Sequence, residues 1–293
     1  RPKSSAASDV YKRQQLIQIT GDLAFSGIEN FNIFGGLVLA GITGIVVIGG
    51  LKRIAEVATF LVPLMGSIYF GAMLIALTLN LDQVFPAFKL ILVDAFNGTA
   101  IAGGTFFGVL IYGVRRGAFS NEAGMGTESL VHGVAKVSDP VKQGLVAMTG
   151  PIFDTLIICT ATALMILISG VWETSTSQGV TLTAEAFSML LGNFGGFILF
   201  ICVICFGLST IFTYSYYGAS CSRFLFGKFG MKFYIYLYIF SIFIYSIVPI
   251  DIAINIADGA FAMMAIPTLV SALWLAPKVM QSSKNYFKLI DNY

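Results

Sequence analysis

The sequence predicts an all-α polytopic membrane protein. Hydrophobic residues make up 57% of the 293 residues and charged residues only 11%, whereas about 25% of the residues in a typical soluble domain are charged. The mean hydropathy is +0.85, and the chain contains 31 glycines, a residue that is commoner in membrane helices than in soluble ones. This composition excludes a soluble domain. The net charge of +2 leaves no basic patch for nucleic acid.

Seven apolar segments approach or exceed the roughly 20 residues that a helix needs to cross the hydrocarbon core of a bilayer. They predict seven transmembrane helices, at residues 33–50, 54–79, 99–116, 142–170, 187–213, 232–248 and 251–277. A single membrane domain would therefore cover residues 33–277.

The loops between these helices differ in charge. Twelve lysines and arginines follow the first, third, fifth and seventh segments, whereas the alternate loops hold one, Lys89. Because loops rich in basic residues remain in the cytoplasm, we expect residues 15–32 to be extracellular and the tail at 278–293 to be cytoplasmic. The location would be the cell membrane.

Residues 1–14 differ from the rest of the chain. They hold four of the 17 basic residues and no apolar period, and a secretory signal would continue into an apolar core. The stretch is similar to translated adaptor sequence at the end of a truncated reading frame. We therefore expect a non-native head and a missing N-terminal part.

The third segment is a candidate binding site. Residues 99–108 contain three glycines and two threonines, with Gly103 and Gly104 adjacent to Thr105. Paired glycines weaken a helix, and unwound backbone persists at membrane depth only where it faces protein or a watery cavity. The alternative is close helix packing through small residues.

Polar side chains in the fourth and fifth segments are further candidates. Asp154 lies in an apolar run, where a carboxylate is costly and marks either a functional site or a buried network. Ser209 and Thr210 lie in a hydroxyl-rich stretch at 206–218, and their oxygens suit a hard cation such as Na⁺. Alternatively, these hydroxyls bond to carbonyls of their own helix.

Three motifs at 113–163 resemble the alanine/glycine:cation symporter family, also called the sodium:alanine symporters. They read Gly113-Val-Arg-Arg-Gly-Ala-Phe-Ser-Asn-Glu-Ala-Gly-Met-Gly126, Asp139-Pro-Val-Lys-Gln-Gly-Leu-Val-Ala-Met148 and Phe153-Asp-Thr-Leu-Ile-Ile-Cys-Thr-Ala-Thr-Ala163. The first motif is the most specific of the three. The resemblance extends from about residue 31 to 287.

The resemblance implies a leucine-transporter-like fold of inverted repeats, in which broken helices meet at a site near the membrane midplane. The seven segments would be core helices four to ten. The implied function is symport of a small neutral amino acid, alanine or glycine, into the cell with Na⁺, or with H⁺. The lipid bilayer and the amino acid are the only partners that we expect, and no obligate protein partner is evident.

The resemblance also implies roles for individual residues. The substrate would be bound by Gly103, Gly104, Thr105, Phe107 and Tyr214, and Na⁺ by Ser209 and Thr210. Gating or structural roles would belong to Arg115, Arg116, Asn121, Glu122 and Asp154. Many family members carry Trp where this chain has Tyr214, and Ser-Ala-Pro where it has Thr127-Glu128-Ser129, so the choice of amino acid stays open.

Two alternatives concern function. A seven-helix receptor would share the expected topology, although the small and hydroxyl-rich segments favour transport. An enzyme is not expected, because the chain shows no nucleophile and base set and has a single histidine, His132. Nothing in residues 15–293 resembles the first core helix of the family fold, so we expect this chain alone to be inactive.

Overall fold

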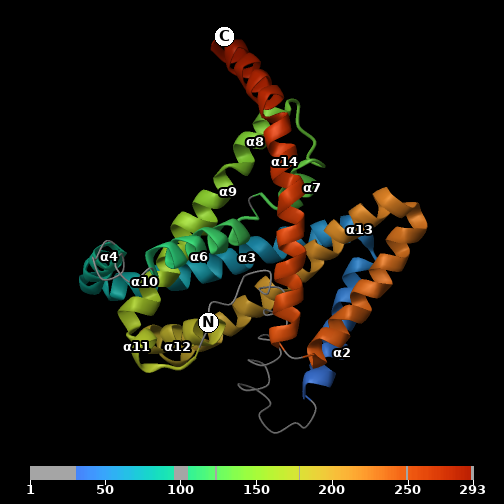
Figure 1. Cartoon of the computed structure of the whole chain (residues 1–293). Coiled ribbons are helices and arrows are strands. Elements are labelled where there is room, and N and C mark those ends of the chain that lie inside the picture. The colour runs from blue at the N-terminus through green and yellow to red at the C-terminus, as the bar shows by residue number, and fades with distance from the viewer. Residues whose placement is uncertain (1–30, 96–104, 123, 178, 249, 292–293) are drawn as a thin grey trace.

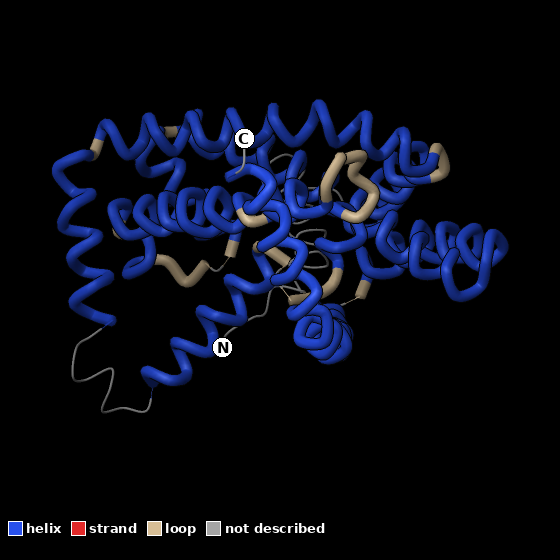
Figure 2. Tube along the Cα trace, turned by 90° about the horizontal axis from the view of Figure 1, so that it is seen from above, coloured by secondary structure: helices blue, strands red, loops and turns tan. Residues whose placement is uncertain are grey.

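The computed structural model describes residues 31–95, 105–122, 124–177, 179–248 and 250–291. These residues form helices and connecting loops, with no strand among them (Figure 2). Four helical stretches are long and apolar enough to cross a membrane: 52–79, 140–169, 193–247 and 259–289. The prediction of a multi-pass helical membrane protein is confirmed, whereas the count of seven spans stays a prediction.

The first described helices follow one another through short connections. Helix α2 (Phe31–Val47) turns into α3 (Gly50–Leu79) at Gly50, whose φ is +75°. Helix α4 (Leu81–Ala95) follows after Asn80, whose side-chain amide donates 2.8 Å to the carbonyl of Ala76. None of the seven predicted segments covers α4, which contains the charged residues Asp82, Lys89 and Asp94.

The middle of the chain holds the three motifs at 113–163. Helix α6 (Thr105–Ser120) is followed by a loop and the short helix α7 (Thr127–His132). A continuous helical stretch then matches the fourth predicted segment, and comprises α8 (Pro140–Ala147), α9 (Thr149–Pro151), the π-helix η1 (Ile152–Cys159) and α10 (Thr160–Ser169). Asp139 caps its start by accepting from the amide of Val141 at 2.8 Å.

The predicted fifth and sixth segments lie mostly in α13 (Asn193–Ile247), in which two helices meet at a kink that falls between the two segments. Helix extends through most of residues 214–231, where the sequence predicts a loop. Helix α13 breaks at Gly227, whose φ of 69° and ψ of −159° are not helical. The chain reverses there, so that α13 has a first arm at residues 193–226 and a second arm at residues 228–247 (Figure 1). Residues 187–191 of the predicted fifth segment belong instead to α12 (Val180–Leu191), which follows α11 (Val171–Thr174). Gly227 lies between the predicted fifth and sixth segments, so the chain reverses in the interval where the sequence predicts a connection.

Helix α14 (Ile250–Asp291) crosses the other helices, and its C-terminal end extends away from them (Figure 1). It continues through most of the predicted tail at 278–293.

Two buried clusters hold the helices together. One joins α2 to both arms of α13 and includes Leu39, Val47, Ile211 and Ile242. The other joins α3, α10, α12 and the first arm of α13 around Phe187, which is fully buried. The first arm of α13 thus takes part in both clusters and forms a fixed support for the residues that follow Phe206.

Candidate functional site

Three consecutive residues at the end of α6 contact other helices. The hydroxyl of Ser120 donates to Oδ2 of Asp154, and the side-chain amide of Asn121 donates to Oγ1 of Thr155 at 3.4 Å. Glu122 accepts at Oε2 from the phenol of Tyr217, at 3.2 Å. The end of α6 is therefore tied to η1 on one side and to α13 on the other.

The loop after these residues has an unusual backbone. Glu122 has a φ of 56°, and Gly124 and Gly126 follow with φ values of 80° and 85°. A non-glycine residue in the left-handed region costs of order 1–3 kcal/mol and persists only where its surroundings hold it there. Gly126 also lies against α14, because a Cβ at this position would come within 2.7 Å of Oγ1 of Thr268.

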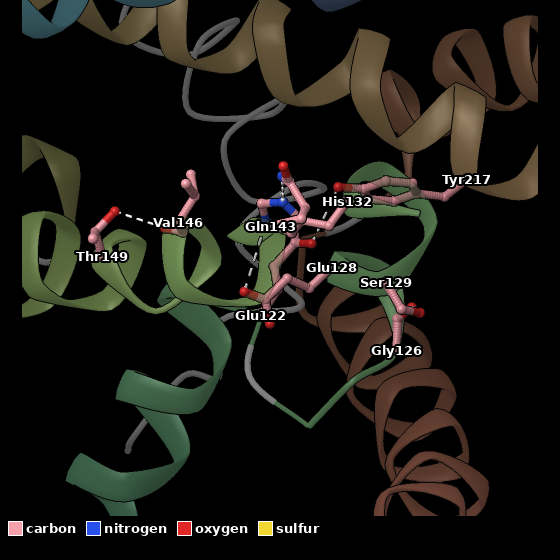
Figure 3. A network of polar contacts seen from close by, with 9 residues as sticks. All are labelled: Glu122, Gly126, Glu128, Ser129, His132, Gln143, Val146, Thr149 and Tyr217. Atoms are coloured by element: carbon pink, nitrogen blue, oxygen red, sulfur yellow. Dashed lines mark hydrogen bonds and ion pairs between the residues drawn. The ribbon is translucent and has the colours of Figure 1, made fainter. Parts of the chain in front are cut away.

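Helix α7 carries a second set of polar contacts (Figure 3). The side-chain nitrogen of Gln143 lies 2.7 Å from Nδ1 of His132, and Nε2 of His132 lies 3.9 Å from the carboxylate of Glu128. The hydroxyl of Ser129 donates 2.7 Å to the carbonyl of Gly126. The short helix is thus joined to α8 and to the loop before it.

A cavity of about 450 Å³ lies between α7, α13 and α14, and we call it the α14 cavity. No charged residue is among the described residues that line it, which are Met125, Gly126, Thr127, Leu130, Tyr214, Tyr217, Gly218, Cys221, Tyr234, Ala260, Phe261, Met264, Pro267 and Thr268. The Tyr214 ring lies 5.2 Å from that of Tyr217 and 6.3 Å from that of Phe261, measured between centroids.

A second cavity, also of about 450 Å³, lies between the end of α6, α7, η1 and α13, and we call it the η1 cavity. It is much more polar, since its lining includes the carboxylates of Glu122, Glu128 and Asp154. The other lining residues are Ser120, Asn121, Val131, His132, Val146, Ala147, Thr149, Gly150, Pro151, Thr213 and Tyr217. A π-helix such as η1 is rare and is frequently found at functional sites.

The two predicted sodium ligands lie elsewhere on α13. The hydroxyls of Ser209 and Thr210 both donate to the carbonyl of Phe206, at 3.0 and 2.8 Å. Ser209 is buried against Met65 of α3, with its oxygen 3.9 Å from the sulfur. Bonding within the helix was the alternative interpretation of these hydroxyls, and it does not prevent their lone pairs from accepting a cation.

The structure brings together part of the predicted site. Asn121, Glu122 and Asp154 line one cavity and Tyr214 the other, and Tyr217 lines both. Thr105, Phe107, Arg115 and Arg116 all lie in α6, where the Phe107 side chain is largely exposed. Gly103 and Gly104 lie outside the described residues.

Tyr217, Ser120 and Thr127 are not among the predicted site residues, and Thr127 enters the sequence analysis only as a departure from the family's Ser-Ala-Pro. Thr127 is only 2% exposed, and its hydroxyl finds no hydrogen-bond partner in the described part of the chain. Tyr217 occurs in the motif Tyr216-Tyr217-Gly218, but nothing in the motif distinguishes its two tyrosines. Only helix packing shows which ring reaches Glu122.

The sequence profile described as the sodium:alanine symporter family matches residues 8–292. An uncharacterized transporter of Bacillus subtilis, YflA, is 36% identical over 88% of this chain and 56% of its own length. The sodium/alanine symporter AgcS of Methanococcus maripaludis is 34% identical over 93% of this chain and 61% of its own. A protein of Bacillus subtilis named a probable sodium/glutamine symporter, GlnT, is 33% identical over 86% and 53%. The chain thus spans little more than half the length of these relatives.

Proposed function

Because the chain belongs to the sodium:alanine symporter family, we propose that it is part of a secondary transporter that carries a small neutral amino acid into the cell together with Na⁺. The observation that carries this proposal is the family match over 285 of the 293 residues, from 8 to 292. It argues against the receptor alternative and makes an enzyme implausible. The activity proposed is that of the full-length protein, and we expect this chain alone to be inactive.

The proposed architecture is the leucine-transporter-like one, with the seven predicted segments as core helices four to ten. The reversal of α13 at Gly227 supports two spans within that helix. The cytoplasmic position of the C-terminus rests on the distribution of basic residues between the loops.

The proposed substrate site combines Gly103, Gly104, Thr105 and Phe107 with Tyr214. The uncharged lining of the α14 cavity next to Tyr214 supports a neutral side chain on the substrate, because a charge there would lose its hydration without a partner. Relatives are named for alanine and for glutamine, so the names of the relatives do not fix the size of the substrate's side chain. Alanine and glycine are the substrates that we propose.

The proposed coupling ion is Na⁺, bound by Ser209 and Thr210 together with backbone carbonyls. A relative named a sodium/proton-dependent alanine carrier, from Bacillus sp. PS3, keeps H⁺ as the second candidate. Arg115, Arg116, Asn121, Glu122 and Asp154 are proposed to order the loop and the gate next to α6. The hydrogen bonds that join Asn121 to η1 and Glu122 to α13 support this role.

The test is transport by the full-length protein in proteoliposomes. We expect labelled alanine to accumulate under an inward Na⁺ gradient, and a K⁺ gradient of the same size to give no accumulation. Unlabelled glycine should compete and unlabelled leucine should not. Accumulation that follows a proton gradient instead would replace Na⁺ by H⁺, and no accumulation under either gradient would remove the proposal.

A further inference from the structure

Tyr217 lies between the two cavities of the candidate site. It is the one described residue that lines both the α14 cavity and the η1 cavity. Its side chain is largely buried, and its ring reaches from α13 toward the Glu122 carboxylate, beside His132 (Figure 3). The phenol donates to Glu122 at 3.2 Å. Tyr217 is therefore the described side chain that the two cavities share.

Helix α7 forms the rest of this partition. Thr127 and Leu130 line the α14 cavity, whereas Glu128, Val131 and His132 line the η1 cavity. One short helix thus presents opposite faces to the two spaces. The partition is anchored to α8 through His132 and Gln143, and to α13 through Glu122 and Tyr217.

The connection between α6 and α7 is suited to movement. Glu122, Gly124 and Gly126 all have left-handed φ values, and a strained residue stays in place only while its neighbours hold it. The hydrogen bond from Tyr217 is such a restraint on Glu122. Loss of this bond would allow the loop to relax and α7 to swing away from α13.

We propose that the hydrogen bond between Tyr217 and Glu122 closes the partition between the two cavities, and that the transporter breaks it once in each cycle to let the amino acid pass. Tyr217 is a positioning residue in this scheme: it holds Glu122 and, through it, α7. The inference rests on the proposed transport function, and it adds the pair of residues that opens and the two spaces that become continuous.

Thr127 provides a reporter of opening. Its side chain is 2% exposed in the closed partition, so a cysteine at this position should react with a thiol reagent only when α7 moves. We would introduce Thr127→Cys into the full-length protein after replacing Cys159, Cys202, Cys205 and Cys221 by alanine. Nanodiscs make both membrane faces accessible, so the experiment does not depend on the orientation of the chain. The rate of maleimide modification is the measurement.

Four further variants separate the hydrogen bond from general packing. Tyr217→Phe and Glu122→Met remove the donor and the acceptor, and each should raise the modification rate about tenfold, a factor that corresponds to about 1.4 kcal/mol. Glu122→Gln keeps an acceptor oxygen and should stay within about twofold of the parent. Tyr216→Phe is the matched control, because Tyr216 packs against the cluster shared by α2 and α13. It should leave the rate unchanged.

The outcomes distinguish this inference from the proposed function. Equal rates in Tyr217→Phe and the parent would overturn the gate, as would an equal rise in Tyr216→Phe, which would indicate general loosening. If the protein transports alanine, adding Na⁺ and alanine together should change the rate of maleimide modification in the parent. The same addition should leave the modification rate of Tyr217→Phe at its raised value. Failure of the parent to transport would contradict the proposed function, while the modification rates would still decide whether Tyr217 and Glu122 hold the partition closed.

Discussion

The phenol of Tyr238 donates a 2.8 Å hydrogen bond to the backbone carbonyl of Ile211, although 27 residues separate them along the same helix. The contact exists because α13 reverses at Gly227 and its second arm packs against its first. Both residues are buried, with exposures of 8% and 2%. The bond joins the second arm to the part of α13 that carries the proposed sodium and substrate residues.

Tyr238→Phe should therefore lower the free energy of unfolding by about 1 kcal/mol, the net contribution of a typical hydrogen bond. Thermal unfolding in detergent is the measurement. Tyr236→Phe is the control, since Tyr236 lies two residues away and is 64% exposed. An equal loss of stability in both variants would show that the bond to Ile211 contributes nothing specific.

Gly126→Ala should destabilise the loop before α7 by about 1–2 kcal/mol, because a left-handed φ is costly for a residue with a Cβ. The Cβ would also meet Oγ1 of Thr268. Adding Thr268→Ala should recover part of the loss by removing that oxygen. Gly144→Ala is the control, since no atom lies within 4 Å of a Cβ built there. Unchanged thermal unfolding in Gly126→Ala would contradict the strained geometry.

Asp154→Ala should loosen the attachment of α6 to η1 by about 1–3 kcal/mol, since hydrogen bonds to charged groups contribute more than neutral ones. Asp154 accepts from Ser120 and, at 3.5 Å, from Thr155. Ser120→Ala removes only one of these donors and should have the smaller effect. Hydrogen exchange of residues 117–122 is the measurement, and a larger effect of Ser120→Ala than of Asp154→Ala would refute the assignment.

Thr210→Ala should abolish the Na⁺ dependence of alanine uptake by the full-length protein, because the proposed site would lose an oxygen ligand. Expression should be unaffected, since within the described residues the hydroxyl donates to the Phe206 carbonyl of its own helix. Ser241→Ala is a matched control, with a hydroxyl that donates within its helix to Tyr238 at 2.7 Å. If uptake by Thr210→Ala rises with Na⁺ as in the parent, Thr210 is not a ligand.

Acidification should release the loop that joins α11 to α12. Hydrogen bonds from Ser175 and Ser177 hold the pKa of Glu185 below its usual range, and the Ser177 hydroxyl lies 2.5 Å from Oε1 of Glu185. A lowered pKa means that the ionised form is favoured in the folded loop. The stabilisation is therefore fully present above the unfolded value of about 4.3 and is lost as the pH falls through the lowered folded value.

Hydrogen exchange of residues 175–185, measured across this acidic range, should accelerate with falling pH in the parent after correction for the intrinsic rate. Glu185→Gln should remove the pH dependence. Glu173→Gln alters an exposed carboxylate in α11 and serves as the control. A pH dependence that survives in Glu185→Gln would assign the effect to another group.

The sequence by itself determined the class of the protein and most of its helices. Hydropathy is a property of each segment, and a helix in lipid must satisfy its own backbone, so apolar length alone predicted α2, α3, α10 and α14. The motif at 113–126 identified the family, and it also marked Asn121 and Glu122 as residues of interest. These conclusions needed no knowledge of which helix lies beside which.

Only the tertiary structure decided which side chains meet. Tyr217 and Glu122 are 95 residues apart, and Ser120 and Asp154 are 34 apart, so no local pattern could pair them. The sequence predicts a connection between residues 213 and 232, but only the structure locates the reversal at Gly227, because the backbone angles of one residue do not alter the hydropathy of the chain. Helix packing placed Tyr217 rather than Tyr216 between the two cavities, since residues adjacent in a helix point about 100° apart and only one of them can face α7.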